Sequence, residues 1–247
     1  MKTEQEQLEY INTTCNTNYK SMEEVDWWHL SMYHTLSEDF IREFSDKVDW
    51  YRISRYQTLS EEFIREFKDE IDWECISMNQ KLSEDFIREF ADKVDWYRIS
   101  RYQILSENFI REFKNKVDWD EISQNQKLSE SFIRDYQNKV DWYRISRYQT
   151  LSEEFIREFS DKVDWYRISR HQTLSEEFIR EFKNEVNWSN ISEYQQLSEN
   201  FIREHADYVN WRILLLKQKL NDKLKRDFRS KIIVKSSDME KADYNNQ

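Results

Sequence analysis

Residues 50–72 read WYRISRYQTLSEEFIREFKDEID, and the next residue is Trp73. The same pattern returns along the chain at a constant step of 23 residues. Repeats of this size are typical of solenoids, in which each repeat packs only on its neighbours. We therefore expect one linear array rather than a set of globular domains. Nine tryptophans mark the step: Trp27, Trp50, Trp73, Trp96, Trp119, Trp142, Trp165, Trp188 and Trp211.

The apolar positions inside one repeat predict two helices. At 100° per residue, the apolar side chains of residues 63–71 fall within about 100° of one another, whereas Trp73 and Ile76 lie roughly opposite. A continuous helix would leave one of the two sets in water, so a break is needed just before Trp73. Helices of about eight residues, near 50–57 and 61–68, are too short to persist alone and must be held by stacking.

Both helix starts carry capping residues. Ser60 and Asp72 are good N-caps, because their side-chain oxygens can accept hydrogen bonds from the amides of the first turn. An apolar residue before each cap is paired with one five positions later, which is the spacing of a hydrophobic staple. The sequence therefore predicts an all-α fold, an α-solenoid of about nine two-helix repeats of 23 residues. The staple pairs are Leu59 with Ile64 and Ile71 with Ile76.

Helix ends are harder to place, because the chain has no glycine and no proline. Helices often end on a left-handed residue, and Asn and Asp tolerate that conformation better than other non-glycine residues. An Asp or Asn recurs after the second helix, so we expect a tight left-handed turn at Asp46, Asp69, Asp92, Asn115, Asn138, Asp161, Asn184 and Asp207. No such residue follows the first helix near 57–58, and the sequence offers no account of its end.

The array is expected to span residues 25–211 and to be closed by atypical ends. Residues 1–24 form a degenerate N-terminal cap in this interpretation. Residues 212–235 hold nine Lys and Arg against two Asp, in a chain whose formal net charge is −11. We expect a basic C-terminal cap helix there, and a disordered polar tail at residues 236–247.

Composition narrows the class of protein. Of the 247 residues, 38% are hydrophobic and 16% aromatic, which suits a packed core and not a disordered chain. No apolar run approaches the ~20 residues of a membrane span, and residues 1–9 are polar and acidic, unlike a secretory signal. The two cysteines, Cys15 and Cys75, do not recur with the repeat, which indicates reduced thiols and a cytoplasmic location.

The repeat string is similar to a known type. Residues 142–156 read Trp-x-x-Ile-Ser-x-x-Gln-x-Leu-Ser-Glu-x-Phe-Ile. This string resembles short tandem helical repeats in proteins of giant DNA viruses of amoebae, and the likeness covers about residues 25–220. The resemblance implies a viral protein in the host cytoplasm, and it brings no catalytic residues with it.

Four other positions recur once per repeat. The tryptophans could stack bases or peptides, but a core position at the start of a helix is favoured. The arginines could follow a phosphate backbone, but an acidic residue comes directly after each of them, which favours an ion-pair ladder or a solvated face. The series beginning at Ser54 is expected to let helices approach closely, and the series beginning at Gln57 to bridge turns. The arginines are Arg42, Arg65, Arg88, Arg111, Arg134, Arg157, Arg180 and Arg203.

One part of the repeat varies regularly. The repeats at Trp50, Trp96, Trp142 and Trp165 begin Trp-Tyr-Arg-Ile-Ser-Arg, and those between the first three do not. Tyrosine and arginine are enriched at binding hot spots, although duplication of a two-repeat block would also produce this pattern. The candidate partner-binding residues are Tyr51, Arg52, Arg55, Tyr56, Tyr97, Arg98, Arg101, Tyr102, Tyr143, Arg144, Arg147 and Tyr148.

The sequence has no constellation for catalysis. The histidines are scattered, and two separate cysteines do not match a zinc pattern. A phosphate-binding loop needs glycine, which the chain lacks. We therefore expect no enzyme activity, no catalytic or cofactor-binding residues, no cofactor and no metal. The histidines are His29, His34, His171 and His205.

Two functions of different classes remain. The favoured one is a non-enzymatic scaffold that binds protein along one face of the solenoid, without contact to a membrane. The alternative is nucleic-acid binding through the arginine series or the basic C-terminal segment. The acidic body disfavours this alternative, because phosphate contacts dominate such affinity and need positively charged faces.

Overall fold

The structure is a computed structural model that describes residues 2–228 and 231. The chain divides into two compact units, an N-terminal unit of Met1–Gln126 and a C-terminal unit of Lys127–Gln247. Within the described residues every regular element is a helix, and none is a strand. The prediction of an all-α solenoid is confirmed, with nine consecutive helix pairs from α2/α3 to α18/α19.

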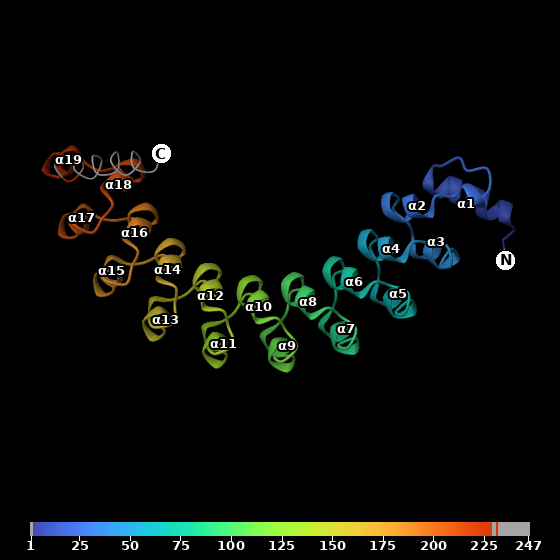
Figure 1. The fold of residues 1–247 in the computed structure, drawn as a ribbon, viewed down its shortest axis with the longest axis horizontal. Coiled ribbons are helices and arrows are strands. Elements are labelled where there is room, and N and C mark those ends of the chain that lie inside the picture. The colour runs from blue at the N-terminus through green and yellow to red at the C-terminus, as the bar shows by residue number, and fades with distance from the viewer. Residues whose placement is uncertain (1, 229–230, 232–247) are drawn as a thin grey trace, which may run out of the picture. The chain divides into compact units, whose positions relative to one another are not determined.

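In the N-terminal unit a longer helix and a short 3₁₀ helix precede the repeats (Figure 1). The elements are α1 (Glu4–Cys15), η1 (Met22–Glu24), α2 (Trp27–Tyr33), α3 (Glu38–Glu43), α4 (Trp50–Tyr56), α5 (Glu61–Glu66), α6 (Trp73–Asn79), α7 (Glu84–Glu89), α8 (Trp96–Tyr102), α9 (Glu107–Glu112) and α10 (Trp119–Asn125).

The C-terminal unit continues the same alternation of seven- and six-residue helices. Its elements are α11 (Glu130–Asp135), α12 (Trp142–Tyr148), α13 (Glu153–Glu158), α14 (Trp165–His171), α15 (Glu176–Glu181), α16 (Trp188–Tyr194), α17 (Glu199–Glu204), α18 (Trp211–Lys217) and α19 (Asp222–Asp227).

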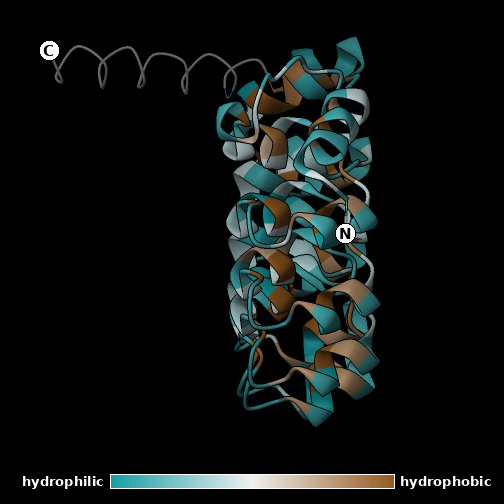
Figure 2. Ribbon diagram, turned by 90° about the vertical axis from the view of Figure 1, so that its right-hand side faces the viewer, coloured by the Kyte–Doolittle hydropathy of each residue, from teal (hydrophilic) through white to brown (hydrophobic). Residues whose placement is uncertain are grey.

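In each unit the even-numbered helices form one row, here called the first-helix row, and the odd-numbered helices from α3 onward form the second-helix row (Figure 1). First helices of consecutive repeats pack directly on one another, from α2 to α10 in the N-terminal unit and from α12 to α18 in the C-terminal unit. The stacked helices carry both polar and apolar segments (Figure 2). Stacking therefore supplies the burial that a six- or seven-residue helix cannot supply alone.

The core consists of small sets of residues repeated at every step. In the repeat at Trp50, the side chains of Ile53, Phe63 and Ile64 are completely buried. The expectation that each tryptophan is a core residue is wrong in most repeats, because of the nine tryptophans, all within the described residues, only Trp211 is buried. The others lie at the edge of the core, where an aromatic ring can pack on one side and keep its N–H at the border.

Trp50 shows this edge position. Its ring packs on Phe67 with the centroids 4.8 Å apart, and its indole Nε1 donates a hydrogen bond to the carbonyl oxygen of Ser45 at 3.0 Å. The ring therefore packs on the C-terminal end of α5, and the indole N–H is hydrogen-bonded to the turn that precedes α4.

The predicted N-caps are confirmed. The Ser60 hydroxyl accepts a hydrogen bond from the amide of Phe63 at 3.1 Å, and the Asp72 carboxylate accepts one from the amide of Cys75 at 2.7 Å. Each cap residue has its own amide held by the preceding repeat. The amide of Asp72 donates to the Ser54 hydroxyl at 2.9 Å. The serine series is therefore a link between repeats as well as a small residue at a close contact.

The first helix ends without a left-handed residue because the next repeat caps it. Gln57 ends α4 in an extended conformation, with φ −91° and ψ 151°. The buried amide of Gln80 then donates to the carbonyls of Ser54 and Gln57, at 3.4 and 2.7 Å, and accepts from the amide of Leu59 at 3.1 Å. Orphan carbonyls at a helix end need partners of this kind. The expectation that the glutamines bridge turns by hydrogen bonds is confirmed.

The expected left-handed turns after the second helices are wrong. Asn16, at the end of α1, is the one residue with positive φ in the described part of the chain. Instead Phe67 ends α5 with φ −109° and ψ 29°, and its carbonyl accepts from the amides of Glu70 and Ile71. That bridge conformation is open to non-glycine residues, so Asp69 needs no special geometry.

The C-terminal cap differs from the prediction. Residues 212–228 do not form one basic helix, because α18 and α19 are separated by a loop and form a ninth helix pair. Trp211, Leu214 and Leu224 pack together in the core of this pair. The rest of the predicted cap helix and the predicted tail lie outside the described residues. These are residues 229–230, 232–235 and 236–247.

Candidate partner-binding surface

The candidate residues lie on the outer side of the first helices. In α4, Ile53 and Ser54 are buried, whereas Tyr51 and Tyr56 are 45% and 44% exposed. Neighbours four apart along a helix meet on one face, and accordingly Arg55 donates a hydrogen bond to the Tyr51 hydroxyl at 2.7 Å. The same arrangement, with the same distance, joins Arg101 to Tyr97 in α8.

The structure brings the four candidates of each helix together. All six tyrosines among them are between 43% and 45% exposed. The arginine that follows the first tyrosine is less exposed and lies near the cap of its own helix. Arg52 pairs with Asp49 at 3.0 Å, and Arg144 pairs with Asp141 at 3.4 Å. These first-helix residues therefore form aromatic and cationic surface on α4, α8 and α12.

In the N-terminal unit this surface is interrupted by acidic repeats. The positions occupied by tyrosine and arginine in α4 and α8 hold Glu74 and Cys75 in α6, and Asp120 and Glu121 in α10. Arg98 forms an ion pair with Glu74 on one side, and Arg101 faces Glu121 at 3.8 Å on the other. The charge of α8 is thus balanced by both neighbours within the chain.

In the C-terminal unit two Tyr/Arg repeats are consecutive. Arg167 of α14 lies 4.4 Å from the ring centroid of Tyr143 of α12 and donates a hydrogen bond to its hydroxyl. Arg147 lies 4.8 Å from the ring of Tyr148, and Arg170 lies 5.0 Å from the ring of Tyr194 in α16. Within the described residues, neither Arg147, Arg167 nor Arg170 forms an ion pair with a carboxylate.

The electrostatic state of His171 reflects this gathering of charge. Burial lowers the pKa of His171, and the positive charges of Arg147, Arg170 and Arg167 lower it further. A neighbouring cation disfavours protonation of an imidazole. The pKa shift is therefore consistent with a locally positive surface on α12 and α14.

The α14 half of this surface was not among the candidates predicted from the sequence. Those candidates stop at Tyr148, although the repeat at Trp165 carries the same Tyr-Arg-Ile-Ser-Arg string. The added residues are Tyr166, Arg167, Arg170 and His171 of α14. Adjacency of two such repeats in the sequence was the available sign, since consecutive first helices stack.

The recurring arginines of the second helices are engaged within the chain. Arg65 donates to Glu89 of the next repeat at 2.7 Å, lies 3.7 Å from Glu61 of its own helix, and stacks 5.0 Å from the ring of Phe86. The same link between repeats recurs at Arg42, Arg88, Arg134, Arg157, Arg180 and Arg203. The expected ion-pair ladder is confirmed for these residues.

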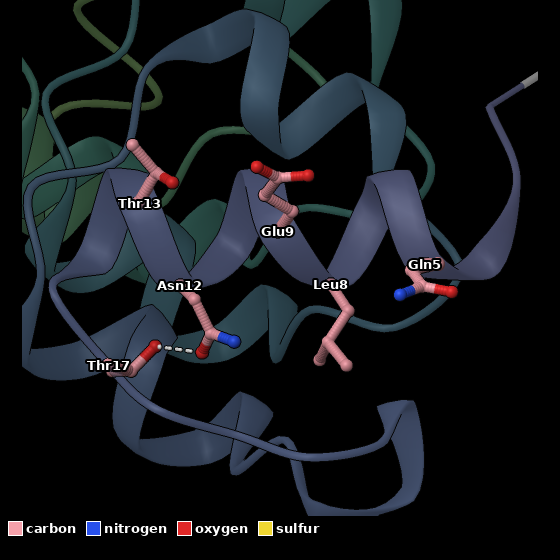
Figure 3. A pocket seen from close by; sticks show the side chains of 6 residues that line it. All are labelled: Gln5, Leu8, Glu9, Asn12, Thr13 and Thr17. Carbon is pink, nitrogen blue, oxygen red and sulfur yellow. Dashed lines mark hydrogen bonds between the residues drawn. The ribbon is translucent and has the colours of Figure 1, made fainter.

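A hollow of about 470 Å³ lies beside α1 (Figure 3). It is lined by Leu8 and five polar residues, and the side chain of Asn12 is already hydrogen-bonded to the following loop. The Asn12 amide donates to the carbonyl of Tyr19 at 2.9 Å and its oxygen accepts from Thr17 at 3.0 Å. The hollow gathers no set of charged or nucleophilic side chains, since Glu9 is its one ionisable residue.

The described residues were also considered as a metal site and as a membrane span. Within them, no group of three or more His, Cys, Asp and Glu side chains is placed to hold a metal ion. No helix there has the length and apolar character needed to cross a membrane. Comparison of the chain with protein-family models, curated proteins and solved structures gave no match.

Proposed function

We propose that this chain is a non-enzymatic repeat scaffold that binds a protein partner along its first-helix row. The observation that supports the proposal is the series of exposed tyrosines and arginines on α4, α8, α12 and α14. These residue types carry much of the energy of protein interfaces. A solenoid presents them at regular intervals, so several repeats can contact one partner together.

Nucleic-acid binding is the weaker candidate. The arginines of the second-helix row have carboxylates of the next repeat as partners, as in the pair of Arg65 with Glu89. A phosphate would have to displace such a carboxylate, and it would meet a chain with formal net charge −11. Because phosphate contacts dominate nucleic-acid affinity, this arrangement favours a protein partner.

The test compares two variants that change the same number of charges on different rows. The first-row variant replaces Arg55, Arg101, Arg147 and Arg170 by Gln, and the second-row variant replaces Arg65, Arg88, Arg157 and Arg180 by Gln. Each is used as bait in extracts of amoebae, the host that the sequence resemblance implies, and captured proteins are identified by mass spectrometry. Circular dichroism checks that both variants retain the helicity of the unaltered chain.

We expect the first-row variant to lose the captured proteins and the second-row variant to retain them. Loss in both variants alike, or in the second-row variant alone, would contradict the proposal. Tight binding of RNA or DNA at physiological salt, with a steep decrease as salt rises, would replace it by the nucleic-acid alternative.

A further inference from the structure

We propose that the surface of α12 and α14 is an acidic-segment site, in which Arg147 and Arg170 bind the carboxylates of an Asp/Glu-rich stretch of a protein partner. The site comprises Tyr143, Arg144, Arg147, Tyr148, Tyr166, Arg167, Arg170 and His171. The inference rests on the proposed scaffold function and specifies where the partner binds and by what chemistry.

Arg147 and Arg170 carry positive charge that no carboxylate of the described residues neutralises. Arg55 and Arg101 of the N-terminal unit occupy the same helix position as Arg147 and Arg170. Within the described residues Arg55 also has tyrosine partners and no carboxylate, but neither helix packed beside α4 is a second Tyr/Arg helix. Arg101 has Glu121 within 3.8 Å, whereas the two arginines of the C-terminal unit have a tyrosine ring as their partner in the described structure and no carboxylate. The alternation that neutralises α8 is missing where α12 and α14 are consecutive.

The nearby acids are engaged elsewhere. Asp141 caps α12 and pairs with Arg144, and Asp164 caps α14 by accepting from the amide of Arg167 at 2.8 Å. Glu193, on the adjoining α16, lies 3.6 Å from Lys217. No acidic side chain of the described C-terminal unit therefore forms an ion pair with Arg147, Arg167 or Arg170.

The arginine side chains of the site are held in place by neighbouring tyrosine rings. A guanidinium can stack one face on an aromatic ring and still present its N–H groups in its own plane to a carboxylate. Arg147 is held against Tyr148, and Arg170 against Tyr194. Holding the side chains in place reduces the entropy that binding would otherwise cost. Arg167 donates a hydrogen bond to the Tyr143 hydroxyl and lies over its ring without a carboxylate partner, so its charge adds to the same surface.

The length of the positive surface favours a short ligand. The positive surface spans two consecutive first helices, and the repeat that precedes them in the sequence carries Asp120 and Glu121. A short acidic segment can meet the arginines of two repeats and stop there. A long polyanion such as RNA would extend over acidic repeats of a chain with net charge −11.

The test uses fluorescence anisotropy with the full chain and three labelled probes. These are the peptide (Glu-Ser)6, the neutral peptide (Gln-Ser)6 and a single-stranded dT oligonucleotide of twelve nucleotides. Measurements are made at about 0.1 M salt, where charges more than about 10 Å apart are largely screened and contacts at the site remain. The double variant Arg147→Gln with Arg170→Gln is compared with the matched control Arg65→Gln with Arg88→Gln, which removes two arginines of the second-helix row that are paired with Glu89 and Glu112.

We expect (Glu-Ser)6 to bind at least tenfold more tightly than (Gln-Ser)6. The Arg147/Arg170 variant should abolish that preference, and the Arg65/Arg88 control should change the affinity less than twofold. Restoring positive charge with Arg147→Lys and Arg170→Lys should recover part of the affinity. Equal losses in both Gln variants, no preference for the acidic peptide, or tighter binding of the oligonucleotide than of (Glu-Ser)6 would each overturn the inference.

Failure here is separable from failure of the scaffold proposal. If captured proteins depend on the first-helix row but the Arg147/Arg170 variant retains them, the acidic-segment site is wrong and the scaffold stands. If capture depends on none of the four first-row arginines, both proposals are wrong.

Discussion

The first-helix rows of the two units have the same internal construction and different surfaces. In the N-terminal unit the Tyr/Arg helices α4 and α8 alternate with the acidic helices α6 and α10, and Arg98 and Arg101 find acidic partners there. In the C-terminal unit α12 and α14 are consecutive, and Arg147 and Arg170 stack on tyrosines. Whether an arginine of the first-helix row is neutralised thus depends on the residues that the neighbouring repeat places beside it, such as Glu121 beside Arg101.

The comparison also shows which positions can vary. Phe63 and Phe178, in different units, are both completely buried, and Gln80 and Gln172 make the same hydrogen bonds in both units. Positions that pack or cap the neighbouring repeat vary little from repeat to repeat, because a change there disturbs two repeats. The outward positions of the first helices contact the neighbour less, so they can differ from repeat to repeat.

The largest expected effect tests whether the two cores are equivalent. Replacing Phe63 or Phe178 by Ala removes a completely buried ring, which typically costs about 3–5 kcal/mol. Both variants should lower the urea midpoint by similar amounts. The surface controls Tyr51→Ala and Tyr166→Ala should change the free energy of unfolding by less than about 0.5 kcal/mol. A large difference between the two Phe variants would show that the cores are not equivalent.

The next effect concerns capping between repeats. Gln80→Ala removes a side chain that makes three hydrogen bonds to the preceding repeat. It leaves buried backbone groups without partners, at a cost of roughly 1–3 kcal/mol. Gln172→Ala should cost the same in the C-terminal unit.

Amide hydrogen exchange checks this capping prediction locally. The amide of Leu59 should exchange faster in the Gln80 variant, and the amide of Leu151 in the Gln172 variant, because these are the donors to the lost carbonyl oxygens. Thr58→Ala, at an exposed position, serves as the control. Unchanged exchange at both leucines would contradict the capping role of the glutamines.

A smaller effect is expected when the acidic partners of the α8 arginines are removed, which should make the surface of α8 resemble that of α12 and α14. Glu74→Gln together with Glu121→Gln removes the acidic partners of Arg98 and Arg101. Glu74 is exposed and Glu121 is buried, and both face partly exposed arginines. Ion pairs at a protein surface contribute about 0.2–1 kcal/mol, so the affinity for (Glu-Ser)6 should rise by up to about fivefold. The measurement is made in the Arg147→Gln, Arg170→Gln background, so that binding at α12 and α14 does not mask the gain. The control, Glu62→Gln with Asp85→Asn, makes the same charge change on exposed acids of the second-helix row and should give no comparable gain.

The smallest effect is a pH dependence at His171. Its pKa is lower in the folded chain than the ordinary value of 6.5, so the unfolded chain binds more protons as the pH falls through about 6.5. Stability should therefore decrease slightly from pH 7.5 to 5.5. His171→Gln should remove that part of the decrease, as seen in the difference between the two melting curves. An equal pH dependence in the variant would show that the pKa of His171 is not lowered in the folded chain.

Much of the architecture was predictable from the sequence. The constant step predicted the solenoid, and Ser60 and Asp72 predicted where the helices begin, because N-capping is a local interaction over three residues. The acidic residue after each ladder arginine correctly predicted ion pairing. The adjacent string at Trp165 could have extended the candidate site to Arg167 and Arg170.

The sequence by itself determined the period, the two helices of each repeat and the residue types on each face, because these depend on neighbours within one or two helical turns. Tertiary structure alone decided that Arg42 pairs with Glu66 and not with the adjoining Glu43, and that Gln80 closes the helix of the repeat before it. It also decided that Trp50 lies at the edge of the core. Those outcomes depend on how one repeat is placed on the next, which brings together residues 21 to 26 positions apart, and no local pattern specifies that placement.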